Sequence, residues 1–104
     1  MKEIQANELG ATLKGETPVV VDFFGDQCAP CKALTPVLEE VGNELAEEVR
    51  IVKLNVAGDN FATASQFGVR SVPTLILFKG GSVVAKRMGT GSKQDILKWI
   101  GENS

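Results

Sequence analysis

The chain has 104 residues, of which 43% are hydrophobic and 23% are charged, so we expect one globular domain over residues 1–104. The formal net charge of −2 gives no basic surface for nucleic acid, and we expect no nucleic-acid partner. No apolar run is long enough to span a membrane, and the start, MKEIQANELG, lacks the apolar segment of a signal peptide. We therefore expect a cytoplasmic protein with no membrane partner.

Histidine is absent, and cysteine occurs twice. Without histidine, the chain has no Cys–His or Ser–His catalysis and no zinc site that needs an imidazole. Two cysteines cannot complete a tetrahedral zinc site within one chain. We expect no bound metal or cofactor, and chemistry that uses thiols, carboxylates, lysines and the backbone.

The first half of the chain predicts a strand, a helix and a second strand, after a short helix over residues 7–14. The run VVVDFF at 19–24 is typical of a central strand covered on both faces. Apolar residues then recur every three or four positions from Pro30 to Val49, which predicts an amphipathic helix of four or five turns. The alternating segment 49–56 predicts a strand, and a right-handed crossover makes it parallel to the first.

The second half predicts a short helix over 60–68, with Phe61 and Phe67 in the core. Segments 74–79 and 82–88 are rich in β-formers and flank two glycines, which indicates a β-hairpin.

A final helix is expected after Ser92, because Asp95 three residues later completes a capping box. The predicted fold class is therefore α/β, with a central mixed β-sheet flanked by helices on both faces.

Cys28 and Cys31 stand where the first long strand gives way to the long helix. Pro30 suits the first helical turn, where no N–H group is needed. Cys28 is then at the helix N-terminus, where free N–H groups and the helix dipole favour a thiolate. Cys31 lies one turn further on, on the same side, within reach for a disulfide. This geometry predicts one exposed, activated thiol and one shielded partner.

The alternative for this pair is a stabilising disulfide or two unreactive cysteines. A disulfide that closes so short a loop adds little stability, and the cytosol would reduce it. Redox chemistry is therefore favoured, given the strand–helix–strand setting.

The ordered motifs of the chain resemble the thioredoxin family. They are VVVDFF, CAPCK, KLN, VPT, LFKGG and MGTGS, and together they cover almost the whole sequence. The resemblance implies the thioredoxin fold and a protein-disulfide reductase, an electron carrier whose first cysteine attacks and whose second resolves. Its redox group would be the Cys28–Cys31 disulfide. The implied partners are disulfide-containing client proteins and a thioredoxin reductase of unknown type, and we expect a monomer.

Asp22 is an acid in a strand otherwise made of valine and phenylalanine, where burial disfavours its charged form. One reading is a polar group satisfied by the neighbouring strand, where Lys53 supplies the opposite charge. The other, which the resemblance supports, is a general base that accepts the Cys31 proton through water when that thiol resolves a mixed disulfide. We favour the general base, because perturbed acids beside reactive thiols cluster at functional sites.

The segment SVPT at 71–74 is the third element of the site. From the sequence, a trans proline tolerated at a strand end is as good a reading as a cis proline. In thioredoxins the matching proline is cis and faces the cysteines, so the resemblance implies that Pro73, with Ala29 and Pro30, shapes the site. It also implies that an extended substrate pairs with the Val72 backbone. The expected substrate contacts are Gln27, Ser71, Val72 and Gly89.

The chain departs from the family at four places. Thioredoxins usually have tryptophan where Phe24 and Gln27 stand, and glycine where Ala29 and Ser71 stand. The general chemistry survives these changes, whereas the reductase and the clients are left open. A thioredoxin dedicated to one partner enzyme or pathway, with its own reductase, is therefore a second hypothesis. A third is a binding module whose cysteines are incidental or bridge a metal between two chains.

Overall fold

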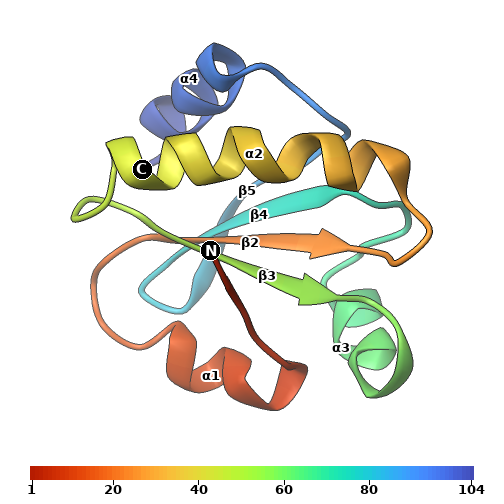
Figure 1. Cartoon of the computed structure of the whole chain (residues 1–104). Coiled ribbons are helices and arrows are strands. Elements are labelled where there is room, and N and C mark those ends of the chain that lie inside the picture. The colour runs from red at the N-terminus through yellow and green to blue at the C-terminus, as the bar shows by residue number, and fades with distance from the viewer.

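Five strands in the order β1-β3-β2-β4-β5 form the centre of the computed structural model, which describes residues 1–104. The strands are β1 (Lys2–Glu3), β2 (Val19–Phe24), β3 (Arg50–Asn55), β4 (Thr74–Lys79) and β5 (Ser82–Met88). The α-helices are α1 (Leu9–Thr12), α2 (Ala29–Glu44), α3 (Phe61–Gln66) and α4 (Lys93–Asn103), with 3-10 turns at Ala6–Glu8 and Gly58–Asn60. Figure 1 shows α2 and α4 on one face of the sheet and α1 and α3 on the other. The predicted α/β class is confirmed.

The central strand is β2, which pairs in parallel with β3 and antiparallel with β4. The parallel pair confirms the predicted strand–helix–strand unit, in which α2 is the crossover. Because β2 and β3 point the same way, their carboxyl ends meet at the edge of the sheet where α2 begins (Figure 1). This edge is where the cysteines lie.

Each face of the sheet has its own buried apolar cluster. The cluster beneath α1 and α3, here the α1–α3 core, consists of Ile4, Leu9, Val19, Val21, Phe23, Val52, Leu54, Ala64, Ile76 and Phe78. The cluster beneath α2 and α4, the α2–α4 core, consists of Val20, Leu34, Leu38, Val41, Val49, Ile51, Leu75, Leu77, Ile96 and Ile100. Side chains alternate along a strand, so Asp22 shares the face of Val20 and lies on the α2 side.

The long helix has the predicted length of four or five turns, but it ends before the last two residues of its apolar pattern. It ends at Glu44, and a turn over 45–48 leads to β3. Leu45 and Val49 nevertheless pack with the α2–α4 core. The spacing of apolar residues did not mark the helix end, because these two side chains reach the same core from the turn and from the start of the strand.

The helix predicted over 60–68 is α3, and its two phenylalanines differ. Phe67 packs as expected, with its ring 5.4 Å from that of Phe78 in an edge-to-face contact. The prediction that Phe61 is in the core is wrong, because its side chain is 65% exposed. The residue buried there is Asn60, whose Oδ1 accepts a hydrogen bond of 2.8 Å from the Ala6 N–H. This polar contact fixes the start of α3 and leaves Phe61 outside.

The predicted hairpin and the last helix are both present. Gly80 and Gly81 have φ of 60° and 82°, the left-handed region that a tight hairpin turn requires and glycine tolerates. At the start of α4, the Ser92 hydroxyl accepts the Asp95 N–H and the Asp95 carboxylate accepts the Ser92 N–H, each at 3.1 Å. None of the helices is both long enough and apolar enough to cross a lipid bilayer.

Candidate active site

Cys28 and Cys31 are joined by a disulfide at the start of α2. The S–S distance is 2.09 Å and the Cα atoms are 5.2 Å apart. Cys28 is the N-cap residue of the helix, and its Sγ accepts a hydrogen bond of 3.1 Å from the Cys31 N–H. No N–H group donates to the Cys31 sulfur. When the disulfide is open, the helix N-terminus therefore stabilises negative charge on Cys28.

Cys28 is less accessible than the sequence predicts, whereas Cys31 is shielded as expected. Cys28 is 7% exposed and Cys31 is 3% exposed, so the expectation of an openly exposed thiol is wrong, although Cys28 remains the more accessible of the two. Part of the reason lies at Gly25, where an added Cβ would sit 3.4 Å from Val72 Cγ2 and 4.0 Å from Cys28 Cβ. The loop that precedes β4 therefore approaches Cys28 closely at this point.

Asp22 is 1% exposed, and its Oδ1 has no hydrogen-bond partner. Burial raises the pKa of this carboxyl to about 7, against the opposing effect of the positive charge on Lys53. The reading in which the neighbouring strand satisfies the acid is thus not supported. A carboxyl with a pKa near neutrality can both release and accept a proton under ordinary conditions.

Lys53 is the register partner of Asp22 across the parallel strands β2 and β3, as the sequence predicts. The two do not form an ion pair, because the only pair within 4.0 Å joins Lys93 and Glu44. The Lys53 Nζ instead lies over the ring of Phe24, 5.3 Å from its centroid.

A hollow of about 180 Å³ lies beside the disulfide and has room for water. It is lined by Phe24, Gly25, Asp26, Cys31, Lys32, Thr35 and Lys53. The hollow joins Cys31 to the lysine that neighbours Asp22. Asp22 itself does not line the hollow.

The second loop of the site carries the cis peptide bond Val72–Pro73, so the isomer that the sequence left open is cis. The Pro73 carbonyl accepts a hydrogen bond of 2.9 Å from the Gly89 N–H. Neither the N–H nor the C=O of Val72 has a partner within the chain. A free stretch of backbone therefore lies next to the cysteine loop, which is the segment 25–28 between β2 and α2.

The remaining predicted residues lie on the surface of the same two loops and of the first turn of α2. Gln27, Ala29 and Pro30 are exposed beside Cys28, and Ser71 is exposed beside Val72. Because Val72 approaches the cysteine loop at Gly25, the residues beside Cys28 and the residue beside Val72 lie at one edge of the sheet.

The sequence reasoning missed three features of this edge. Gly25 makes room for the approach of Val72. Asp26 accepts a hydrogen bond of 2.7 Å from the Asn55 side chain, which ties the cysteine loop to the end of β3. Met88, the register partner of Thr74, is 72% exposed. Each of these features depends on contacts between segments that are distant in the sequence. Only Gly25, a glycine between the strand and Cys28, gave a signal in the sequence itself.

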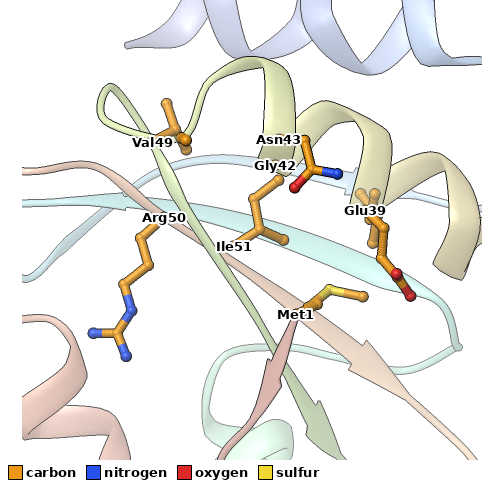
Figure 2. Close-up of a pocket in the computed structure, with 9 residues that line it drawn as sticks. Met1, Glu39, Gly42, Asn43, Val49, Arg50 and Ile51 are labelled. Atoms are coloured by element: carbon orange, nitrogen blue, oxygen red, sulfur yellow. The ribbon is translucent and has the colours of Figure 1, made fainter.

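A second hollow, of about 240 Å³, lies between α2, the start of β3 and Met1. Figure 2 shows Glu39 and Asn43 projecting from α2 on one side and the Arg50 side chain extending away from Glu39. It contains no cysteine and lies toward the other end of α2. No group of three or more Cys, Asp or Glu side chains is arranged to hold a metal ion.

Comparison with known proteins gives a single family. The family model described as Thioredoxin matches residues 1–102. Thioredoxin of Haemophilus influenzae is 45% identical over 91 residues, which cover 88% of this chain and 84% of that protein. Thioredoxin C-2 of Corynebacterium nephridii is also 45% identical, over 88% of this chain and 83% of its own. Thioredoxin of Rickettsia typhi is 40% identical, over 88% of this chain and 86% of its own.

Proposed function

The chain belongs to the thioredoxin family and is a thiol–disulfide oxidoreductase, and we propose that Cys28 is its nucleophile and Cys31 its resolving thiol. The observation that carries this assignment is the hydrogen bond from the Cys31 N–H to the Cys28 sulfur at the N-terminus of α2. The matched relatives are thioredoxins, so a protein dedicated to one partner enzyme is not favoured. The disulfide within one chain weighs against cysteines that bridge a metal between two chains.

In the first step, the Cys28 thiolate attacks one sulfur of a client disulfide. A bond forms between the Cys28 sulfur and the client, and the other client sulfur leaves as a thiolate that takes up a proton. The helix N-terminus favours this step because it stabilises the attacking thiolate.

In the second step, the Cys31 thiol loses its proton and attacks the Cys28 sulfur. The disulfide of the protein forms, and the second client sulfur leaves, so that two electrons have passed to the client. Asp22 is our proposed general base, acting through water in the hollow that Cys31 and Lys53 share. Its pKa of about 7 supports this role, because the carboxylate is then a base of suitable strength near neutral pH.

Client proteins dock on the loop of Val72 in this proposal. The unpaired N–H and C=O of Val72 are suited to pairing with an extended client segment as an added strand. Gln27, Ser71 and Gly89 would contact the client, while Ala29, Pro30 and Pro73 shape the surface around the disulfide. The protein would act as a monomer in the cytoplasm, where a thioredoxin reductase returns the disulfide to thiols.

Insulin reduction in the presence of dithiothreitol tests the activity directly. The wild-type chain should accelerate reduction, and the variants Cys28→Ser and Cys31→Ser should not accelerate it beyond dithiothreitol alone. A chain whose cysteines are incidental would leave the rate unchanged in all three.

The role of Asp22 needs a single-turnover measurement of mixed-disulfide resolution against pH. In the wild type, the rate should rise as pH increases through about 7, where the carboxyl loses its proton. Asp22→Asn should lack this rise and resolve more slowly above neutral pH, while its first step stays near the wild-type rate. Equal resolution rates in both proteins across the pH range would show that Asp22 is not the base.

A further inference from the structure

Lys53 lies beside a buried acid, yet its ammonium is placed against an aromatic ring. Asp22 and Lys53 face each other across β2 and β3. The Lys53 Nζ lies 5.3 Å from the centre of the Phe24 ring, no ion pair with Asp22 is formed, and the Asp22 Oδ1 is left without a partner. This arrangement needs an explanation, because an ammonium and a carboxylate at neighbouring positions attract each other.

The strand geometry shows where the lysine side chain goes. Phe24 is two residues beyond Asp22 on the same face of β2, which is about 7 Å further along the strand. Phe24 is level with Asn55, the residue two positions after Lys53. The lysine side chain therefore leans toward the carboxyl end of the strands, where Phe24 and Lys53 both line the hollow beside Cys31.

We propose that Phe24 is a positioning residue, whose ring holds the Lys53 ammonium toward the hollow and away from the Asp22 carboxyl. The face of an aromatic ring attracts a cation, and the hollow keeps the ammonium near water. If the ammonium instead reached Asp22, the pair would stabilise the carboxylate and weaken it as a base. This inference rests on the proposed role of Asp22 and names the residue that preserves that role.

Other charged groups around Asp22 do not replace Lys53. On the β4 side, its register partner is Leu75, which carries no charge. Arg87 of β5 lies one strand further away and donates to the Thr90 carbonyl at 3.4 Å.

From the cysteine loop and α2, Asp26 and Lys32 line the same hollow. Both side chains are exposed, and Asp26 is bound to Asn55. In the oxidised protein the two cysteines do not titrate. Lys53 is thus the only charged residue that lies opposite Asp22 in register on a neighbouring strand.

The test is an NMR titration of the Asp22 side-chain carboxyl in the oxidised protein, with Phe24→Leu as the main variant. Leucine keeps an apolar side chain but has no ring, so the ammonium is released toward the carboxyl. We expect the pKa of Asp22 to fall by about half a pH unit, the size expected for losing an exposed cation–ring contact. Phe24→Tyr keeps the ring and should keep the wild-type pKa.

The same substitution in a protein without Lys53 distinguishes positioning of the ammonium from exclusion of water by the Phe24 ring. In Lys53→Met, the change Phe24→Leu should leave the Asp22 pKa where Lys53→Met alone puts it. An equal fall with and without Lys53 would mean that Phe24 only excludes water, and no fall in either would also overturn the proposal. These titrations do not measure catalysis. A negative result would leave the general-base role of Asp22 standing, and loss of that role would leave the proposed function of Phe24 standing.

The wild-type protein offers a measurement that no folding defect can obscure. The Lys53 side-chain protons near Nζ should be shifted upfield by the Phe24 ring, and Phe24→Tyr should retain the shift. Lys53 signals at ordinary exposed-lysine positions in the wild type would contradict the proposed contact.

Discussion

Asp22 opposes stability through its burial, and its proposed role as general base depends on the same burial. Its carboxyl is 1% exposed with an unpaired oxygen, so ionisation in the folded state is disfavoured. The acid within the apolar run VVVDFF was enough to predict both the burial and the perturbed proton affinity. The position of the Lys53 ammonium was not predictable, because it depends on which neighbour a long flexible side chain contacts.

Asp22→Asn should stabilise the protein in a pH-dependent way. The folded carboxyl has a pKa of about 7 and the ordinary value is 3.8, so between these values the folded state holds a proton that the unfolded chain has released. The contribution of Asp22 to wild-type stability therefore falls as pH rises through this range and levels off above it. The variant should match the wild type near the lower value and exceed it by up to roughly 4 kcal/mol above the higher one.

Denaturant titrations of both oxidised proteins at a series of pH values measure this difference. The free-energy difference between them should grow with pH and then stay constant. A difference that does not change with pH would show that burial does not raise the pKa of Asp22.

The elements were more predictable than their ends. Strand β2, the hairpin and the capped start of α4 follow from local patterns that the structure confirms. The end of α2 and the exposure of Phe61 did not follow, because each depends on contacts with other segments. Strand β1 was missed because two residues are too few to show a period.

The packing of α4 predicts a small fluorescence response to reduction. Trp99 is the only tryptophan and packs on the α2–α4 core. Lys93 of α4 lies 3.2 Å from Glu44 at the last turn of α2, roughly 24 Å along the helix from the cysteines at about 1.5 Å per residue. Opening the disulfide should therefore change Trp99 emission only slightly.

Emission spectra of the oxidised and dithiothreitol-reduced protein test this arrangement, with Phe24→Trp as the comparison. That variant places a tryptophan beside the disulfide, where quenching is expected, and should brighten clearly on reduction. A several-fold increase in the wild type would mean that α4 packs against the site.

At the scale of the whole molecule, the site is assembled from loops that are distant in the sequence. The cysteine loop, the Val72 loop and Gly89 meet because β2, β4 and β5 bring their ends together. The ordered motifs predicted the fold and the meeting of the cysteines with the proline loop at one edge of the sheet. They did not predict the low exposure of Cys28 or the hollow beside Cys31, which arise from how closely the loops pack.

The whole site also predicts the direction of electron flow. Oxidising dithiol proteins strongly stabilise the thiolate of their reduced form. Here the residues between the cysteines are Ala29 and Pro30, the chain has no histidine, and Lys32 is exposed, where water and salt screen its charge. The helix N-terminus alone gives only moderate stabilisation, so the reduced protein should donate electrons to ordinary protein disulfides.

Equilibration against glutathione buffers, read by thiol labelling and mass, measures this balance. The Cys28–Cys31 disulfide should stay largely oxidised in a mildly reducing glutathione buffer and become reduced with dithiothreitol. A pair that is fully reduced in the same glutathione buffer would identify an oxidant or isomerase instead.

Trapping of the mixed disulfide tests most directly the claim that Cys28 attacks and Cys31 resolves. Reduced Cys31→Ser is mixed with an oxidised peptide that contains one disulfide, and the adduct is located by intact mass and peptide mapping. We predict a stable adduct on Cys28 that dithiothreitol releases, and little adduct on Cys28→Ser, whose remaining thiol is the more buried one. Equal trapping on Cys28→Ser, or no adduct on Cys31→Ser, would contradict the account.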